Sequence, residues 1–289
     1  MGSTTVGAFR DDEARVRYAA ALEAAMAVLP PHISHDVPTA YGTVRVHRFG
    51  DGDATPLLLV PGRVGTTAMW APNLPALAAR RTVWALDLLG EPGASVQTAP
   101  ITGDADQGAW LAEVADALGG PLHVVGASLG GRWALELAVA HPGAVRSLAL
   151  LEPAHTLARL RPGFVLASLA SLAGFEDLFL RYAGGDTPPA DDPLTAVMTL
   201  GARDYRMTLG PPGYPPDAAL RGLAMPVLAL LGGRSTVLHA GRAAAWARAR
   251  IPDVEVEVWP DAGHALPGSH ADAVDARLAA FHTRVEEGP

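Results

Sequence analysis

A serine with a glycine two residues away on each side is the part of this sequence best suited to carry out chemistry. Ser128 lies in the segment GASLG, residues 126–130, after an apolar run at 122–125 and before apolar residues at helical spacing over 132–140. This order predicts a strand, a sharp turn and a helix. A side chain two positions from the serine would collide with the neighbouring strand or helix, so glycine is needed there. The serine hydroxyl is therefore expected at the tip of the turn, facing the free N–H groups of the following helix.

A serine hydroxyl is a poor nucleophile near neutral pH, so it needs a base within hydrogen-bond reach and an acid to orient that base. Among the ten histidines, His264 has the best position, in the loop that directly follows a predicted strand at 254–259. The strands of a parallel sheet all run the same way, so the loops that follow them share one edge. We therefore expect His264 to meet Ser128 at that edge and to act as its base.

The elements that would position these residues alternate regularly between strand and helix. An amphipathic helix is predicted at 11–29, where it would pack against the rest of the domain. Short apolar runs without polar breaks are typical of strands buried on both faces of a parallel sheet. The pattern predicts an α/β fold with a mostly parallel, doubly wound sheet. The predicted strands are 44–49, 57–60, 81–88, 122–125, 145–151, 226–231 and 254–259.

The alternation stops between residues 154 and 221, where only short helical patterns occur. We interpret this segment as a helical lid inserted into a core domain made of residues 1–153 and 222–289. Its aromatic and methionine side chains are expected to line an apolar pocket above Ser128, which favours a mid-sized apolar or aromatic substrate. The lid residues predicted to bind substrate are Phe164, Phe175, Phe179, Tyr182, Met198 and Tyr205.

With these features the chain resembles the α/β-hydrolases over residues 44–285. The serine turn, the order of nucleophile, acid and histidine along the chain, and the position of the lid all match that superfamily. The segments MWAPNL at 69–74 and WALDLLG at 84–90 resemble a bacterial carboxylesterase branch in particular. The resemblance implies the α/β-hydrolase fold and a serine esterase activity.

The sequence departs from the superfamily at the position of the acid. In most members the acid follows the strand that is predicted here at 226–231, but Ser235 occupies that position and cannot carry a charge. A minority, such as haloalkane dehalogenases and some lactone hydrolases, carry the acid one strand earlier, where this chain has Glu152. We predict that Glu152 orients His264, with Asp261 or the lid residue Asp204 as alternatives. Replacing Glu152 should then cost far more activity than replacing Ser235.

The second departure is in the loop after the strand at 57–60. The familiar His-Gly of the superfamily is replaced by Pro61-Gly62, followed by Arg63. Backbone N–H groups do not depend on side-chain identity, so those of Arg63 and Leu129 are predicted to form the oxyanion hole. The Arg63 side chain has two interpretations. It binds a carboxylate or phosphate of the substrate, or it pairs with a carboxylate of the lid.

Composition excludes several classes of function. The net charge of −8 does not favour nucleic acid or an anionic membrane as partner. The 22 basic residues are all arginine and there is no cysteine, which excludes Schiff-base and thiolate chemistry. No motif for a metal or another cofactor is present. No signal peptide or membrane span is recognised, so a cytoplasmic protein is expected. The oligomeric state is not determined by the sequence, and a homodimer is left open.

The sequence therefore predicts a cofactor-free serine hydrolase that cleaves a carboxylic ester, thioester or lactone through an acyl-enzyme. Ser128 would attack, His264 would transfer the proton and Glu152 would stabilise the imidazolium. The two departures also leave open a lyase, cyclase or acyltransferase of a biosynthetic pathway on the same scaffold. A ligand-binding relative without activity is a third alternative, which the presence of both Ser128 and His264 disfavours.

Overall fold

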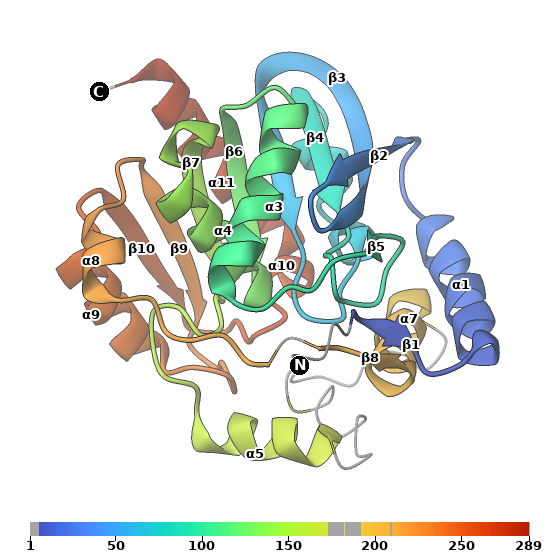
Figure 1. The fold of residues 1–289 in the computed structure, drawn as a ribbon. Helices are drawn as coiled ribbons and strands as arrows, with labels where there is room; N and C mark the ends of the chain where they lie inside the picture. Colours follow the sequence, from blue (N-terminus) through green and yellow to red (C-terminus); the bar gives the residue numbers. More distant parts are fainter. Residues whose placement is uncertain (1–5, 173–181, 183–191, 209, 289) are drawn as a thin grey trace.

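The computed structural model describes residues 6–172, 182, 192–208 and 210–288. An eight-stranded sheet forms the centre of the molecule, with helices on both of its faces (Figure 1). Five strands run parallel in the order β10-β9-β7-β6-β3. The prediction of a mostly parallel, doubly wound sheet is confirmed. The bounds of these strands are β3 (Gly42–Val60), β6 (Leu122–Ala127), β7 (Val145–Leu151), β9 (Val227–Gly232) and β10 (Val254–Trp259).

The other edge of the sheet differs from the prediction. The runs at 44–49 and 57–60 belong to one long strand, β3, which arches around β4 (Arg81–Leu86) (Figure 1). The first half of β3 is antiparallel to β4, with Val46 opposite Leu86. In the second half of β3, residue numbers rise together along both strands, from Leu57 opposite Val83 to Leu59 opposite Ala85. β2 (Ile33–Thr39) and the short β5 (Val96–Gln97) both pair antiparallel with β3 and complete this edge.

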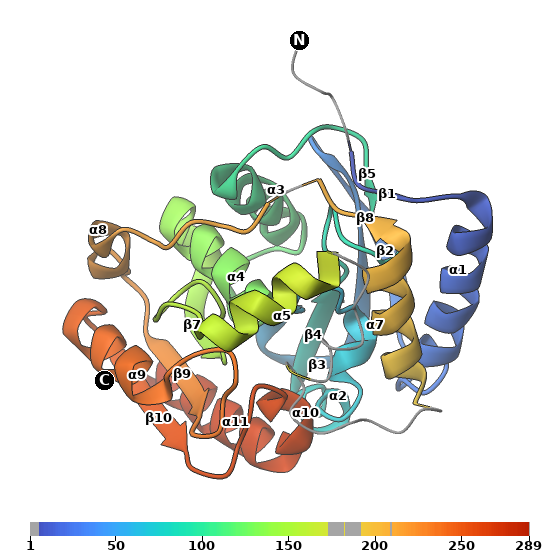
Figure 2. The same ribbon diagram turned by 90° about the horizontal axis from the view of Figure 1, so that it is seen from below.

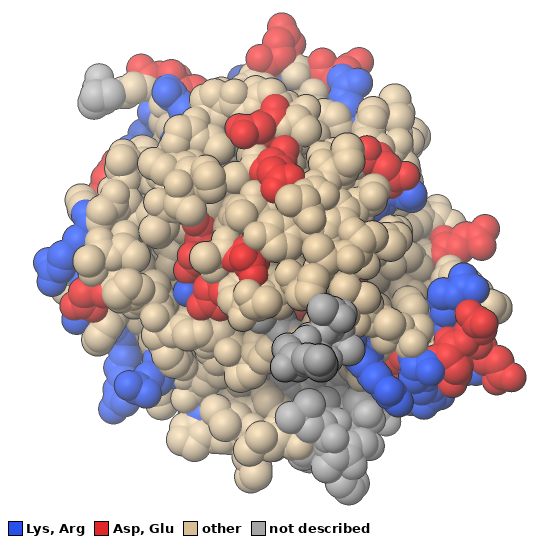
Figure 3. Space-filling view, in the orientation of Figure 1, with Lys and Arg blue, Asp and Glu red and all other residues tan. Residues whose placement is uncertain are grey.

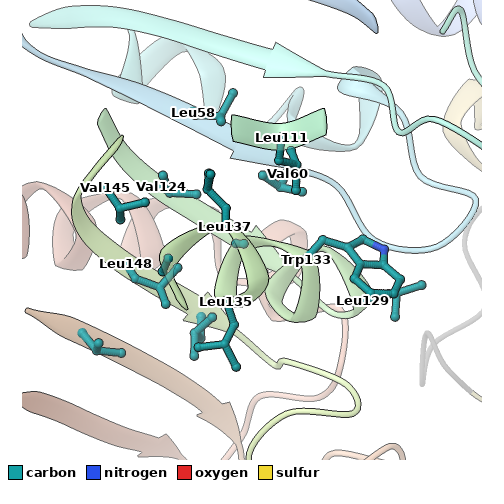
Figure 4. Close-up of a cluster of buried hydrophobic side chains, with 14 of the residues drawn as sticks. Leu58, Val60, Leu111, Val124, Leu129, Trp133, Leu135, Leu137, Val145 and Leu148 are labelled. Atoms are coloured by element: carbon teal, nitrogen blue, oxygen red, sulfur yellow. The ribbon is translucent and has the colours of Figure 1, made fainter. Parts of the chain in front are cut away.

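The core lies on both faces of the sheet because neighbouring residues of a strand point to opposite faces. On β9, for example, Ala229 belongs to one buried cluster and Leu228 to the other. Figure 4 shows part of the first cluster, which contains Trp133 and strand residues such as Val124. This cluster lies under α3 (Asp104–Ala117), α4 (Leu129–Ala140) and α9 (Ala240–Arg250). The second lies under α2 (Leu74–Leu77), α10 (Leu266–Ser269) and α11 (Ala271–Glu287).

Helix α1 (Asp12–Met26) begins where the acidic start of the predicted helix suggests but ends three residues early. Asp11 caps it by accepting a hydrogen bond from the N–H of Ala14 at 2.7 Å. The helix packs along α7 (Pro193–Asp204) (Figure 2). The strand before it, β1 (Ala8–Phe9), pairs with β8 (Tyr205–Arg206). The N-terminal segment is thus held mainly by the chain that follows β7.

Between β7 and β9 the structure describes α5 (Pro162–Leu172), α7, β8 and α8 (Asp217–Arg221). Figure 1 shows α5 beyond the ends toward which the parallel strands point. The division into a core and a lid at residues 154–221 stays a prediction. Over the described part of the chain, no helix is both long enough and apolar enough to cross a membrane.

Candidate active site

Ser128 occupies a tight turn between β6 and α4. Its backbone has φ 50° and ψ −120°, a strained conformation for a residue with a side chain. The flanking glycines are sterically required. A Cβ on Gly126 would lie 2.5 Å from the carbonyl oxygen of Gly130, and one on Gly130 would lie 2.2 Å from that of Pro61. The turn therefore presents the serine hydroxyl at the carboxyl edge of the sheet.

His264 lies in the loop after β10 and reaches both predicted partners. Its Nε2 is 2.9 Å from Oγ of Ser128, and its Nδ1 is 3.1 Å from Oε2 of Glu152. The imidazole side chain is 11% exposed, so solvent has limited access to it. The structure thus brings these three residues, from the ends of three strands, into one hydrogen-bonded chain.

Glu152 follows β7 directly, with φ 48°, and its side chain is fully buried. Its Oε1 accepts a hydrogen bond from the N–H of Gly232 at 2.6 Å, and its Oε2 accepts one from the hydroxyl of Ser235 at 2.5 Å. With His264, three donors face the carboxyl group, which accepts from each of them as a carboxylate. The sequence did not identify Ser235 as one of these donors. The adjacency of β7 and β9 is the signal that could have placed it there.

The alternative acids do not contact His264. Asp261 forms an ion pair with Arg234 at 2.8 Å, and its side chain is 79% exposed. Asp204 is buried, and its carboxylate is bound by arginines, including Arg203 at 2.8 Å. Both alternatives are wrong, and Glu152 is the carboxylate beside the imidazole.

The loop after β3 lies against Ser128. A Cβ built on Gly62 would lie 3.2 Å from Cβ and 3.8 Å from Oγ of Ser128. The next N–H, that of Arg63, forms no hydrogen bond with any other residue of the described part of the chain. The N–H of Leu129 lies in the first turn of α4, where backbone donors lack a partner within the helix. Within the described part of the chain, the N–H groups of Arg63 and Leu129 are thus two backbone donors without a partner near Ser128.

Two buried carboxylates after β4 hold this loop in place. Glu91 accepts from the N–H of Val64 at 3.2 Å, and Asp87 accepts from the N–H of Thr67 at 2.8 Å. Val64 has φ 52°, which is rare for a β-branched residue and requires such support. Burial raises the pKa of Glu91, and the nearby guanidinium of Arg63 partly opposes that rise.

Among the described residues, the Arg63 side chain has a carboxylate partner outside the predicted lid. Its Nε lies 3.5 Å from Oε1 of Glu91, a residue of the loop after β4. The buried acid beside this guanidinium thus belongs to the core, and pairing with a lid carboxylate stays a prediction. About a third of the Arg63 side chain is exposed, so binding of a substrate anion stays a prediction.

The residues predicted to bind substrate have different environments. The ring centroid of Phe164 lies 6.4 Å from that of His264, next to the site. Tyr182 packs at the edge of a small cluster that contains Phe164. Tyr205 contacts Phe9 of β1 in an edge-to-face arrangement at 5.0 Å. Met198 is half-buried on α7. Phe175 and Phe179 lie outside the described residues, and for all six the contact with substrate stays a prediction.

No group of three or more metal-ligating side chains occurs among the residues that the structure describes. The chemistry available at the site is that of a hydroxyl, an imidazole, a carboxylate and free backbone donors. These are the parts needed for nucleophilic attack on a carbonyl carbon with stabilisation of an oxyanion.

The fold and this site define a class of protein. The chain belongs to the α/β-hydrolase fold family, whose model matches residues 55–206. Among curated proteins it is similar to the carboxylesterase YbfK of Bacillus subtilis, with 27% identity over 85% of this chain and 86% of that one. An uncharacterized carboxylesterase, nap, of the same organism is 29% identical over 85% of both chains.

Solved structures agree with these matches. The crystal structure of carboxylesterase CesB (YbfK) from Bacillus subtilis has a TM-score of 0.87 and 25% identity, covering 93% of this chain and 98% of that one. Naproxen esterase from Bacillus subtilis has a TM-score of 0.86 and 27% identity, with the same coverage. The prediction of an α/β-hydrolase resembling bacterial serine carboxylesterases is confirmed, and the chain is a hydrolase.

Proposed function

We propose that this protein is a carboxylesterase that uses Ser128, His264 and Glu152 as a catalytic triad. The observation that carries the proposal is the continuous hydrogen-bonded chain through the imidazole, with 2.9 Å to the serine hydroxyl and 3.1 Å to the carboxylate. Similarity to bacterial carboxylesterases over most of the chain supports ester hydrolysis as the reaction.

In the proposed reaction, Oγ of Ser128 attacks the ester carbonyl carbon while Nε2 of His264 takes the hydroxyl proton. Glu152 holds the imidazole through Nδ1 and stabilises its positive charge. The N–H groups of Arg63 and Leu129 donate to the oxyanion of the tetrahedral intermediate, an effect worth roughly a hundredfold in rate per donor. Collapse of the intermediate breaks the ester C–O bond, and His264 returns the proton to the leaving alcohol.

The second half of the reaction hydrolyses the acyl-enzyme. Water attacks the acyl carbon, His264 takes a proton from the water, and Ser128 leaves with that proton as the carboxylic acid is released. The balanced result is one ester and one water converted to one acid and one alcohol.

The proposed substrates are esters with a mid-sized apolar or aromatic acyl or alcohol group. Phe164, which packs next to His264, supports an apolar surface at the site. A similar protein is called naproxen esterase, which agrees with an aromatic acyl group. Aromatic lactones and thioesters offer the same carbonyl chemistry and belong in the same substrate panel.

A fluorophosphonate probe and an ester panel test this proposal. The probe should label Ser128 in the wild-type protein, and a Ser128→Ala variant should show neither labelling nor ester hydrolysis. Reaction in ¹⁸O-labelled water should place the label in the new carboxylate, whereas a lyase, a cyclase or transfer to another acyl acceptor would not. Hydrolysis that persists in Ser128→Ala, or a wild-type protein that the probe does not label, would contradict the proposal.

A further inference from the structure

The hydroxyl of Ser235 has a fixed direction. It lies 2.5 Å from Oε2 of Glu152, and it accepts hydrogen bonds from the N–H groups of Val237 at 3.2 Å and Leu238 at 3.3 Å. A hydroxyl has one proton and two acceptor sites. Because two backbone donors occupy the acceptor sites, the proton of Ser235 is left to donate to the carboxylate.

The backbone around Ser235 is also held in place. Its carbonyl oxygen accepts a hydrogen bond from Arg161 at 3.1 Å, and its own N–H donates to the carbonyl of Gly232 at 3.1 Å. The residue is 1% exposed. The hydroxyl is therefore presented to Glu152 by a rigid turn after β9 and has little freedom to turn toward water.

Ser235 and His264 donate to the same atom. Oε2 of Glu152 receives the hydroxyl proton and the proton on Nδ1 of the imidazole, while Oε1 is bound by the N–H of Gly232. Without the hydroxyl, Oε2 would keep His264 as its one donor. The carboxylate could then turn about its Cγ–Cδ bond, with Oε1 still held by the hydrogen bond from Gly232. The imidazole depends on that oxygen for its orientation toward Ser128.

We propose that Ser235 is a positioning residue that fixes the carboxylate of Glu152. The proposal rests on the triad of the proposed function.

The first experiment compares Ser235→Ala with the wild-type protein on a chromogenic ester. Loss of a hydrogen bond to a charged group should lower kcat about tenfold with little change in KM. The acid limb of kcat/KM should move to higher pH, because a carboxylate with one donor fewer attracts the proton of His264 more strongly. A purely structural role would change the melting temperature and leave the pH limb in place.

Ser147→Ala is the matched control. Ser147 is a fully buried serine bonded to a histidine, His123, at 2.7 Å, but it lies near the opposite end of β7. This variant creates a similar cavity and should leave kcat and its pH limb unchanged. Equal kcat and equal pH limbs for Ser235→Ala and the wild-type protein would overturn the positioning role.

The second experiment combines the two changes. Glu152→Ala should lose about 100-fold or more in kcat. Because Ser235 acts through the carboxylate of Glu152, adding Ser235→Ala to this variant should cost no further kcat. A further tenfold loss in the double variant would overturn the proposal. Failure of the triad itself is seen separately, as a wild-type protein whose Ser128 is not labelled by the probe.

Discussion

At the scale of single residues, strained backbone conformations occur in the loops around Ser128. Val64, Ser128, Glu152 and His155 have φ between 48° and 53°. All four lie in loops that follow β3, β6 or β7, at the carboxyl edge of the sheet. A side chain in this region costs about 1–3 kcal/mol, so the surrounding hydrogen bonds must hold it there. The strain aims the hydroxyl and the carboxylate at the same imidazole.

The negative charge of the Glu152 carboxylate is expected to be needed for turnover. Glu152→Gln keeps the volume of the side chain but removes the charge that stabilises the imidazolium, so kcat should fall by about 100-fold or more. Asp261→Asn removes a carboxylate from the same loop as His264, but that group is largely exposed and should have no effect. Steady-state kinetics on one ester measures both. Similar kcat values for the two variants would contradict the role of Glu152.

Alanine substitutions at two glycines of the site should affect stability and catalysis differently. A Cβ on Gly130 would overlap the backbone of β3, so Gly130→Ala should lower the melting temperature strongly. A Cβ on Gly62 would come closest to Cβ of Ser128, at 3.2 Å, and its next contact, with the carbonyl oxygen of Ala127 at 3.5 Å, is an ordinary one, so Gly62→Ala should lower kcat more than stability. Gly143→Ala is the control, since nothing lies within 4 Å of its Cβ. Thermal unfolding and kinetics of the three variants test this order, and a Gly130→Ala protein as stable as Gly143→Ala would contradict it.

Residue types and their spacing predicted the serine and the histidine because local rules govern both positions. A tight strand-to-helix turn demands glycines, and parallel strands bring their following loops together. The hydroxyl of Ser235 was not predicted as a donor, and neither was the ion pair between Arg63 and Glu91. Both contacts join loops that lie far apart in the chain, and their geometry depends on side-chain rotamers that no local pattern specifies.

At the scale of elements, ion pairs to a single aspartate at the end of α7 hold the N-terminal segment against that helix. The buried carboxylate of Asp204 is bound by Arg10 at 3.0 Å and Arg17 at 3.4 Å from the N-terminal segment, and by the adjacent Arg203. These arginines hold the pKa of Asp204 below its ordinary value, with the hydrogen bond from Arg203 as the main cause. The pairing thus stabilises the fold above the ordinary pKa of an aspartate and is lost as the pH falls through the lower folded value.

Asp204→Asn should loosen this junction. The amide cannot balance three guanidinium groups, so we expect faster hydrogen exchange in α1 and α7 and faster proteolytic cleavage before β2. Asp217→Asn is the matched control, because its partner Arg250 belongs to α9 and the aspartate side chain is 48% exposed. Equal hydrogen-exchange rates of α1 in both variants would contradict the role of the Asp204 ion pairs in holding α1 against α7.

Sequence patterns predicted the strands and helices of the core better than the connections between them. The apolar runs predicted β6, β7 and β9 because these strands are almost entirely buried, whereas the edge strand β10 is only partly buried. The polar residues 51–53 indicated a break, yet β3 continues through them because β4 pairs with the strand on either side. The partner of α1 was not predicted, since an amphipathic helix shows which face is apolar and not which element covers it.

At the scale of the whole molecule, the same three residue types meet a second time. His123 contacts Oγ of Ser147 at 2.7 Å and Oε1 of Glu286 at 3.1 Å. Ser147 and His123 are fully buried near the amino ends of β6 and β7, far from the loops that hold Ser128. No ester can reach this serine. Position at the carboxyl edge of the sheet, and not residue type alone, therefore distinguishes the candidate active site.

This buried histidine cluster predicts how stability depends on pH. His123 stacks on His282 with ring centroids 4.2 Å apart, and burial lowers the pKa of both, that of His123 to about 4. In the unfolded chain both histidines take up protons below about 6.5, whereas in the native protein His123 stays neutral until about 4 and burial also keeps the pKa of His282 well below 6.5. The free energy of unfolding should therefore fall as the pH drops from about 6.5 to about 4. His282→Phe keeps a stacked ring without a titrating group and should make this fall shallower, measured by urea unfolding across that range. His141→Phe, at an exposed position, should leave the slope unchanged, and equal slopes for all three proteins would show that the buried pair does not cause the dependence.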